Sequence, residues 1–202
     1  MCPIRSENRI CLFRGNINNR FRKSDQYLLP VTNPGSVDGE YDIYPSLKIT
    51  DNQIFAGFES LAEKIKDHRN VIIDGYAGVF YDIFRKEIDE ILSRKGLRIT
   101  WVDTSGFFKP ESQIRDITAP FLGGDDPLFG KRSILNLDDF FIPGKLESIS
   151  PDPDSDINIV IGPGASMVSW DALLIYADIP KNEVQYRSRA GSISNLGMSV
   201  PS

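Results

Sequence analysis

The chain contains few of the residues on which metal and nucleophilic enzymes depend. Its 202 residues include one histidine and two cysteines, Cys2 and Cys11, which lie close together near the N-terminus. This set is too small for a His-rich or Cys-rich zinc site. A Ser-His-Asp or Cys-His arrangement would need His68, which lies in the polar stretch KIKDHRN and suits a solvated helix end. We therefore expect no metal held by this chain, although an all-carboxylate Mg²⁺ site stays open.

The sequence also lacks the features of membrane, secreted and nucleic-acid-binding proteins. No apolar run approaches 18 residues, and the first twenty residues have no apolar stretch typical of a secretory signal. The two cysteines cannot form disulfides across the later sequence, which favours a reducing compartment. The net charge is −5, which disfavours general attraction to nucleic acid. We expect a cytoplasmic protein with neither membrane nor nucleic-acid partners.

The composition indicates one globular domain with an N-terminal extension. Hydrophobic residues make up 41% and charged residues 25% of the chain, which is ordinary for a folded domain. Residues 1–23 carry six Lys or Arg and one acid, and a turn-rich stretch follows. A basic arm of this kind can bind nucleic acid or serve in targeting, but we favour a disordered leader. We divide the chain into a loosely ordered basic arm and linker (1–40), a compact domain (41–197) and a tail (198–202).

The apolar pattern predicts an α/β fold. Short apolar runs without alternation are typical of buried strands, and they occur at 46–50, 70–74, 97–102, 157–161 and 173–177. Helical periodicity or helix-start signals occur between or after them, at 58–65, 80–92, 110–117, 138–149, where Pro143-Gly144 breaks the helix, and 180–189. Gly96 stands where a C-terminal helix cap is expected. Strands that alternate with helices predict a mostly parallel sheet with helices on both faces.

The residues that follow the predicted strands are the first candidates for a binding site, because ligands of such sheets bind beyond the carboxyl ends of the strands. Three aspartates occupy these positions: Asp74, Asp103 and Asp178. They can position Mg²⁺ or accept a proton from a substrate hydroxyl. Aspartate is also a common turn residue and helix cap, so a structural role is the alternative for each of them.

A glycine-containing turn between a strand and a helix suggests an anion site. In VIIDGYAGVFYDIF the turn holds Gly75 and Gly78, and backbone N–H groups at such a turn can face a phosphate. A Walker A loop adds a lysine and a Ser or Thr, but Val79 and Phe80 stand in their place. The turn thus predicts phosphate binding without phosphoryl transfer; a tight turn without a ligand is the alternative.

Two later motifs supply further candidate ligand-binding residues. The segment IGPGAS contains Gly162 and Gly164, which suit either a close approach to a ligand or a turn that ends a strand. In KNEVQYRSRAG, Arg187 and Arg189 can reach phosphate oxygens, but they equally suit the end of a helix, where cations complement the dipole.

Together these segments resemble a known family. The strings YDIYPSLKI, VIIDGYAGVFYDIF, DDPLFGKRSILNLDDFF, VIGPGAS and, most specifically, IYADIPKNEVQYRSR resemble the N-terminal region of a long bacterial form of class I mannose-6-phosphate isomerase, from about Lys23 to Gly197. In that family, mannose 6-phosphate and fructose 6-phosphate interconvert in a C-terminal cupin whose zinc is held by Gln, Glu and two His. This chain has one His, so the resemblance implies a non-catalytic domain whose partner is the cupin, in cis or in trans.

The order of strands and loops is also similar to uridine-kinase-like P-loop kinases. By that similarity WVDTSGFF supplies Asp103 as the base, and IYADIPKNEVQYRSR supplies a strand ending in D-x-P before an Arg-bearing helix. The chain departs from the family at the missing lysine and hydroxyl of the phosphate loop. We therefore predict a binding or regulatory domain that takes a nucleotide or sugar phosphate. The alternatives are a small-molecule kinase, in which Asp74 or Asp178 helps to hold Mg²⁺, and a structural interaction domain.

Overall fold

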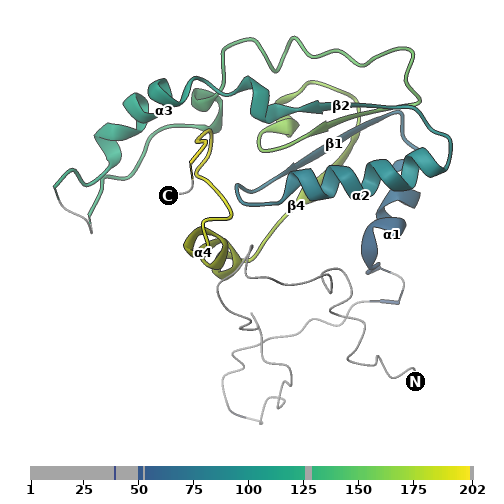
Figure 1. The fold of residues 1–202 in the computed structure, drawn as a ribbon, viewed down its shortest axis with the longest axis horizontal. Coiled ribbons are helices and arrows are strands. Elements are labelled where there is room, and N and C mark those ends of the chain that lie inside the picture. Colours follow the sequence, from purple (N-terminus) through teal and green to yellow (C-terminus); the bar gives the residue numbers. More distant parts are fainter. Residues whose placement is uncertain (1–38, 40–49, 52, 126–128, 201–202) are drawn as a thin grey trace.

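The computed structural model describes residues 39, 50–51, 53–125 and 129–200. Within these residues, helices and strands alternate along most of the chain (Figure 1). Their order is α1 (Gly57–Ile65), β1 (Asn70–Gly75), α2 (Tyr81–Arg94), β2 (Ile99–Asp103), α3 (Glu111–Thr118), β3 (Ile157–Ile161), β4 (Leu173–Ala177) and α4 (Lys181–Arg189). Short 3-10 helices also occur, among them η2 (Thr104–Phe107), η4 (Leu137–Phe140) and η5 (Ala165–Met167).

The strands form one sheet in which every pairing is parallel, in the order β2-β3-β1-β4. The predicted α/β class with a parallel sheet is therefore confirmed. β3 is buried along its whole length and β1 over its four central residues. These two strands are the inner ones, which explains why their sequences are apolar without alternation.

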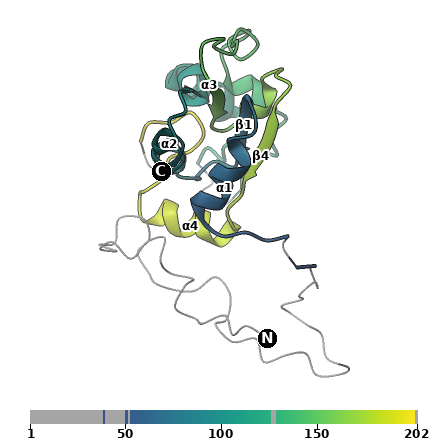
Figure 2. The same ribbon diagram turned by 90° about the vertical axis from the view of Figure 1, so that its right-hand side faces the viewer.

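Two hydrophobic clusters cover the two faces of the sheet. Alternate residues of β1, such as Val71 and Ile73, pack on one face against α1 and α2, which lie side by side (Figures 1 and 2). Ile72 points to the other face, where it joins Phe141, Leu146 and residues around η5. The second face is therefore covered by 3-10 helices and turns instead of long helices.

Most of the predicted elements are present, and one is not. Gly96 has a φ of +79°, and its N–H donates to the Ser93 carbonyl 2.9 Å away, so it ends α2 as predicted. The helix predicted for 138–149 is wrong. Only η4 forms there, because Phe141 turns into the core and Gly144 adopts a φ of +76°. The basic arm at 1–23 and nearly all of the strand predicted for 46–50 lie outside the described residues.

None of the helices in the described part of the chain is both long enough and apolar enough to cross a membrane.

Candidate functional site

The carboxyl ends of the four strands meet at one edge of the sheet. Asp74 pairs in register with Tyr176 of β4, while Asp103 at the end of β2 pairs with Ile161 of β3. Asp178 directly follows β4. The sheet thus brings the predicted strand-end residues to a single edge, where ligands of parallel sheets bind.

Asp74 holds the two glycine turns of this edge together. Asp74 is 6% exposed, and its carboxylate accepts N–H hydrogen bonds from Gly75 at 2.6 Å, Gly164 at 2.9 Å and Ser166 at 3.0 Å. The Ser166 hydroxyl also donates to it. Because both oxygens are engaged by the protein, Asp74 acts as a structural clamp between β1 and the loop that follows β3.

The turn after β1 uses several of its own amides internally. The Tyr76 N–H donates to the Ala177 carbonyl at 3.3 Å, the Val79 N–H to Tyr76 at 3.3 Å and the Tyr81 N–H to Val79 at 3.0 Å. Gly75 is required here, because a Cβ at this position would lie 2.1 Å from the Ala177 carbonyl oxygen. The turn therefore fixes α2 against β4 and does not present its amides as a continuous phosphate cradle.

Arg187 anchors α4 on the same turn. Its guanidinium donates to the Gly78 carbonyl at 2.7 Å and to Glu183 at 2.9 Å, and it lies 4.0 Å from the centre of the Phe80 ring. The Arg187 and Glu183 side chains are only 15% and 12% exposed. Arg189, by contrast, is exposed at the end of α4. The sequence did not distinguish the two arginines, but the structure shows that Arg187 is largely buried and Arg189 is exposed. The i, i+4 spacing of Glu183 and Arg187 in the sequence could have indicated their ion pair.

Asp103 and the loop after β3 have local structural roles. The Asp103 carboxylate accepts the Ser105 N–H at 2.8 Å and so caps η2. Gly162, with a φ of +125°, leaves room for Thr104, whose hydroxyl oxygen would lie 2.2 Å from a Cβ at position 162. Thr104 donates in turn to the Pro163 carbonyl at 2.9 Å. Gly164 likewise leaves room for the Phe141 ring, whose carbons would lie 2.8 Å from an added Cβ, so both glycines after β3 serve close packing at this edge.

The strand-end aspartates do not form a metal centre. Within the residues that the structure describes, no group of three or more His, Cys, Asp or Glu side chains is arranged to hold a metal ion. Asp74 is engaged by Gly164 and Ser166, and Asp178 instead lines a separate hollow with Tyr76 and Lys181. The residues present do not fit the Mg²⁺ site that the kinase alternative requires.

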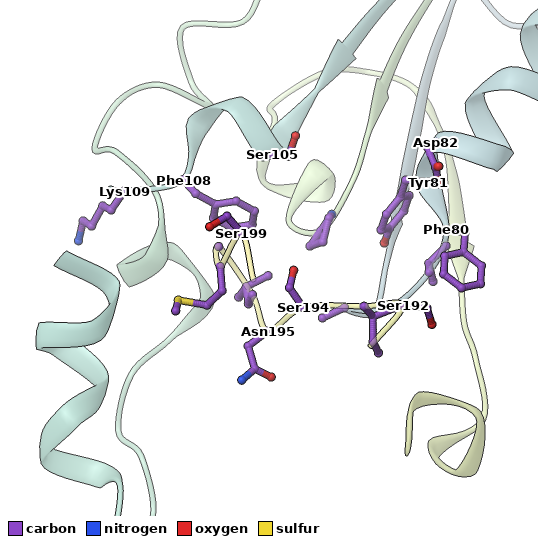
Figure 3. Close-up of a pocket in the computed structure, with 18 residues that line it drawn as sticks. Phe80, Tyr81, Asp82, Ser105, Phe108, Lys109, Ser192, Ser194, Asn195 and Ser199 are labelled. Atoms are coloured by element: carbon purple, nitrogen blue, oxygen red, sulfur yellow. The ribbon is translucent and has the colours of Figure 1, made fainter. Parts of the chain in front are cut away.

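A cavity of about 530 Å³ opens beside the glycine turn (Figure 3). The turn and the first residues of α2 form one wall, Ser105, Phe108 and Pro163 form another, and a C-terminal segment, residues 192–199, closes the third. This segment runs from α4 toward α3 (Figure 1). The volume falls within the range of small-molecule sites.

The C-terminal segment is held in place at both ends. The Ser192 hydroxyl donates to the Arg187 carbonyl at 3.0 Å. Ser199 donates its hydroxyl to the Glu111 carboxylate at 2.6 Å and its N–H at 3.3 Å. Gly197, with a φ of +70°, packs on Ile114, whose methyl carbon would lie 2.2 Å from an added Cβ. No catalytic or ligand-binding motif marks residues 192–199, so this wall of the cavity was not predicted as a site.

The lining of the cavity is rich in hydroxyl groups and nearly balanced in charge. Besides Ser105, the C-terminal segment contributes Ser192, Ser194 and Ser199. Tyr81 and Ser194 turn their hydroxyl groups toward the middle of the cavity (Figure 3). These groups can donate and accept hydrogen bonds, and the adjoining aromatic rings offer apolar contact.

The charged groups of the lining are few. Asp82 contributes a carboxylate, and Lys109 extends away from the middle of the cavity and donates to the Asp139 carbonyl at 2.6 Å (Figure 3). Burial, and secondarily the negative charge of Asp74, raises the pKa of Tyr81 above its ordinary value. The Tyr81 hydroxyl is therefore neutral at physiological pH; it donates to the Tyr76 carbonyl at 3.4 Å, and its oxygen can accept a hydrogen bond from a ligand.

A comparison with protein-family models finds one match, over residues 57–202, to the family described as "Domain of unknown function (DUF8485)". No curated protein and no solved structure matches the chain. The match begins with α1 and includes every wall of the cavity.

Proposed function

The chain belongs to the DUF8485 family, and we propose that it is a non-catalytic binding domain for a small hydroxyl-rich molecule: a sugar, a nucleoside or a monophosphate of either. The observation that carries this proposal is the cavity of about 530 Å³ at the carboxyl edge of the sheet, with its serine-rich wall. Hydroxyl side chains pair with ligand hydroxyls as donors and acceptors, and Phe108, whose ring stacks on Phe141, adds an apolar contact to the lining.

The charge of the lining favours a ligand with little charge. Polyphosphates are bound by cations that converge on the phosphate oxygens. Here Arg187 is committed to Gly78 and Glu183, and Lys109 to Asp139, while Asp82 adds a negative charge to the lining. We therefore propose that a nucleoside triphosphate binds more weakly than the corresponding nucleoside or monophosphate.

The absence of catalysis is supported by the roles of the candidate acids. A catalytic base or Mg²⁺ ligand must face the substrate, but Asp74 faces Gly164 and Ser166, and Asp103 caps η2. The phosphate turn has no lysine or hydroxyl residue at the positions that a kinase uses. Phosphoryl transfer by this chain is thus not the activity we propose.

A zinc-containing cupin isomerase remains the proposed partner, in cis or in trans. Its support is the sequence resemblance of IYADIPKNEVQYRSR and the related segments. Under this proposal the domain binds the hexose phosphate that the partner converts, and the isolated chain does not interconvert mannose 6-phosphate and fructose 6-phosphate. An isolated chain that catalyses this conversion would refute the proposed division of roles.

Calorimetric titration of the full chain tests the binding proposal. The probes are mannose 6-phosphate, fructose 6-phosphate, adenosine, AMP and ATP. Ser194→Phe fills the cavity from its C-terminal wall, and Ser150→Phe is the control, because Ser150 is exposed and outside the lining. We expect at least one uncharged or monophosphate probe to bind wild type and the control, and to lose at least about tenfold in affinity for Ser194→Phe. Binding that Ser194→Phe leaves unchanged would contradict the proposal.

A further inference from the structure

Within the described part of the chain, β4 is an edge strand whose sequence lacks the usual protecting residues. It pairs with β1 on one side, and no described element pairs with its other side. Its sequence, LLIYA, contains no charge and no proline, although natural edge strands are normally shielded by such residues. Leu174 and Tyr176 are 56% and 63% exposed on one face. An edge of this composition is suited to strand addition.

The backbone of β4 has a defined orientation at this edge. The Ala177 carbonyl accepts the Tyr76 N–H, so Ala177 turns its polar backbone groups toward the β1 side. Because backbone groups point alternately to the two sides of a strand, those of Leu174 and Tyr176 point outward. The residues with exposed side chains are therefore also the residues that can form hydrogen bonds with an added strand.

We propose that β4 pairs antiparallel with β4 of a second copy of this chain, with Ile175 of the two copies meeting on a two-fold axis. Leu174 of one copy then faces Tyr176 of the other. The two-fold axis generates a second, identical pair on the other side of Ile175. Both residues turn their N–H and C=O groups outward, as a hydrogen-bonded antiparallel pair requires. Aromatic-aliphatic pairs of this kind stabilise adjacent strands, and the surface is self-complementary.

The flanking residues are compatible with this register. Asp171 of one copy comes opposite Ile179 of the other, and Asp178 comes opposite Ala172. No two acidic residues therefore face each other directly, although Asp171 of one copy lies one position from Asp178 of the other at each end of the pair. An acidic peptide would place further like charges beside these aspartates, so a second copy is the favoured occupant.

The expected dimer is weak. A stable interface buries about 800 Å² on each partner. β4 has five residues, so the edge contributes less than this area. We expect a reversible dimer with a dissociation constant on the order of 100 μM, formed by β4 and a few neighbouring side chains.

Sedimentation over a series of concentrations tests the dimer with the full chain. Leu174→Lys places like charges in the strand pair and is expected to raise the dissociation constant at least about tenfold. Leu122→Lys is the control, since Leu122 is 67% exposed and lies beyond α3. A wild-type chain that stays monomeric up to millimolar concentration would overturn the proposal, as would equal weakening by both variants.

Cysteine cross-linking tests the register in a background of Cys2→Ser and Cys11→Ser. Leu174→Cys mixed with Tyr176→Cys is expected to form the mixed disulfide, because these positions face each other across the axis. Preferential cross-linking of Leu174→Cys with itself would overturn the register. Hydrogen exchange completes the test: if the amides of Leu174 and Tyr176 are equally protected in dilute and concentrated samples, the edge is covered within one chain and the proposal fails.

Discussion

The Asp74 carboxylate accepts a hydrogen bond from the Gly164 N–H at 2.9 Å, across 90 residues of sequence. This bond joins the turn after β1 to the loop after β3, and the two turns together shape one end of the candidate cavity. Asp74 is therefore the residue on which the geometry of this edge most depends.

Removal of the Asp74 carboxylate is expected to destabilise the domain. Asp74→Ala leaves the amides of Gly164 and Ser166 without their acceptor in a buried position. We expect a loss of about 3 kcal/mol in the free energy of unfolding, measured by urea denaturation. Asp103→Ala is the matched control, because Asp103 is exposed and accepts one amide; it should lose about 1 kcal/mol. Equal losses of stability in the two variants would contradict the role of Asp74 as a clamp between the two turns.

Gly75 is expected to tolerate no side chain. In Gly75→Ala the added Cβ meets the backbone oxygen of Ala177 at 2.1 Å, and backbone cannot move aside cheaply. We expect a loss of roughly 2–4 kcal/mol. Gly106→Ala is the control, because no atom lies within 4 Å of the added Cβ. Thermal unfolding of the two variants gives the comparison. A Gly75→Ala protein as stable as wild type would show that β1 and β4 do not approach each other as closely as described.

Arg187 and Arg189 are expected to differ on mutation. Arg187→Gln removes the contact with Gly78 and the largely buried pair with Glu183. We expect a loss of about 2 kcal/mol, with faster hydrogen exchange in the turn before α2. Arg189→Gln should change stability by less than about 0.5 kcal/mol, because Arg189 is exposed. Similar effects of the two variants would argue against the anchoring of α4 by Arg187.

The C-terminal segment is expected to loosen in acid. The Ser199 hydroxyl, followed by Arg115, lowers the pKa of Glu111 from 4.5 to about 2. A lowered pKa means that the contact stabilises the segment above about pH 4.5 and is lost as the pH falls toward 2. The protection factor of the Ser199 amide, measured by NMR relative to the intrinsic exchange rate at each pH, should fall across this window. In Glu111→Gln this pH-dependent fall should be absent, and a protection factor that is unchanged at pH 2 in wild type would contradict the prediction.

The fold was largely predictable, because its strands are short apolar runs bounded by Gly, Asp and Pro. Buried strands such as NVIID and INIVI leave a local signal, and so does the glycine at the end of α2. The region 138–149 was mispredicted because its apolar residues fill the second face of the sheet as separate turns around Phe141 and Leu146. The periodicity of the local sequence does not show that these residues must pack against the sheet, which is formed by distant segments.

The candidate site was predictable in position but not in the roles of its residues. Parallel topology places Asp74, Asp103 and Gly162 at one edge, and this follows from the strand pattern alone. That Asp74 faces inward to Gly164, instead of outward to a ligand, depends on contacts between distant segments. The wall formed by residues 192–199 likewise depends on where α4 and α3 are packed, and no sequence motif marks it.

The most direct test of the account is a ¹H–¹⁵N NMR titration of the full chain with mannose, adenosine, mannose 6-phosphate, AMP and ATP. Binding at the carboxyl edge predicts saturable shifts for at least one uncharged or monophosphate probe, centred on the amides of Ser105, Tyr81 and Ser194, with weaker effects from ATP and no conversion of any probe. Spectra that stay unchanged for all of these probes, or shifts that map away from these residues, would contradict it.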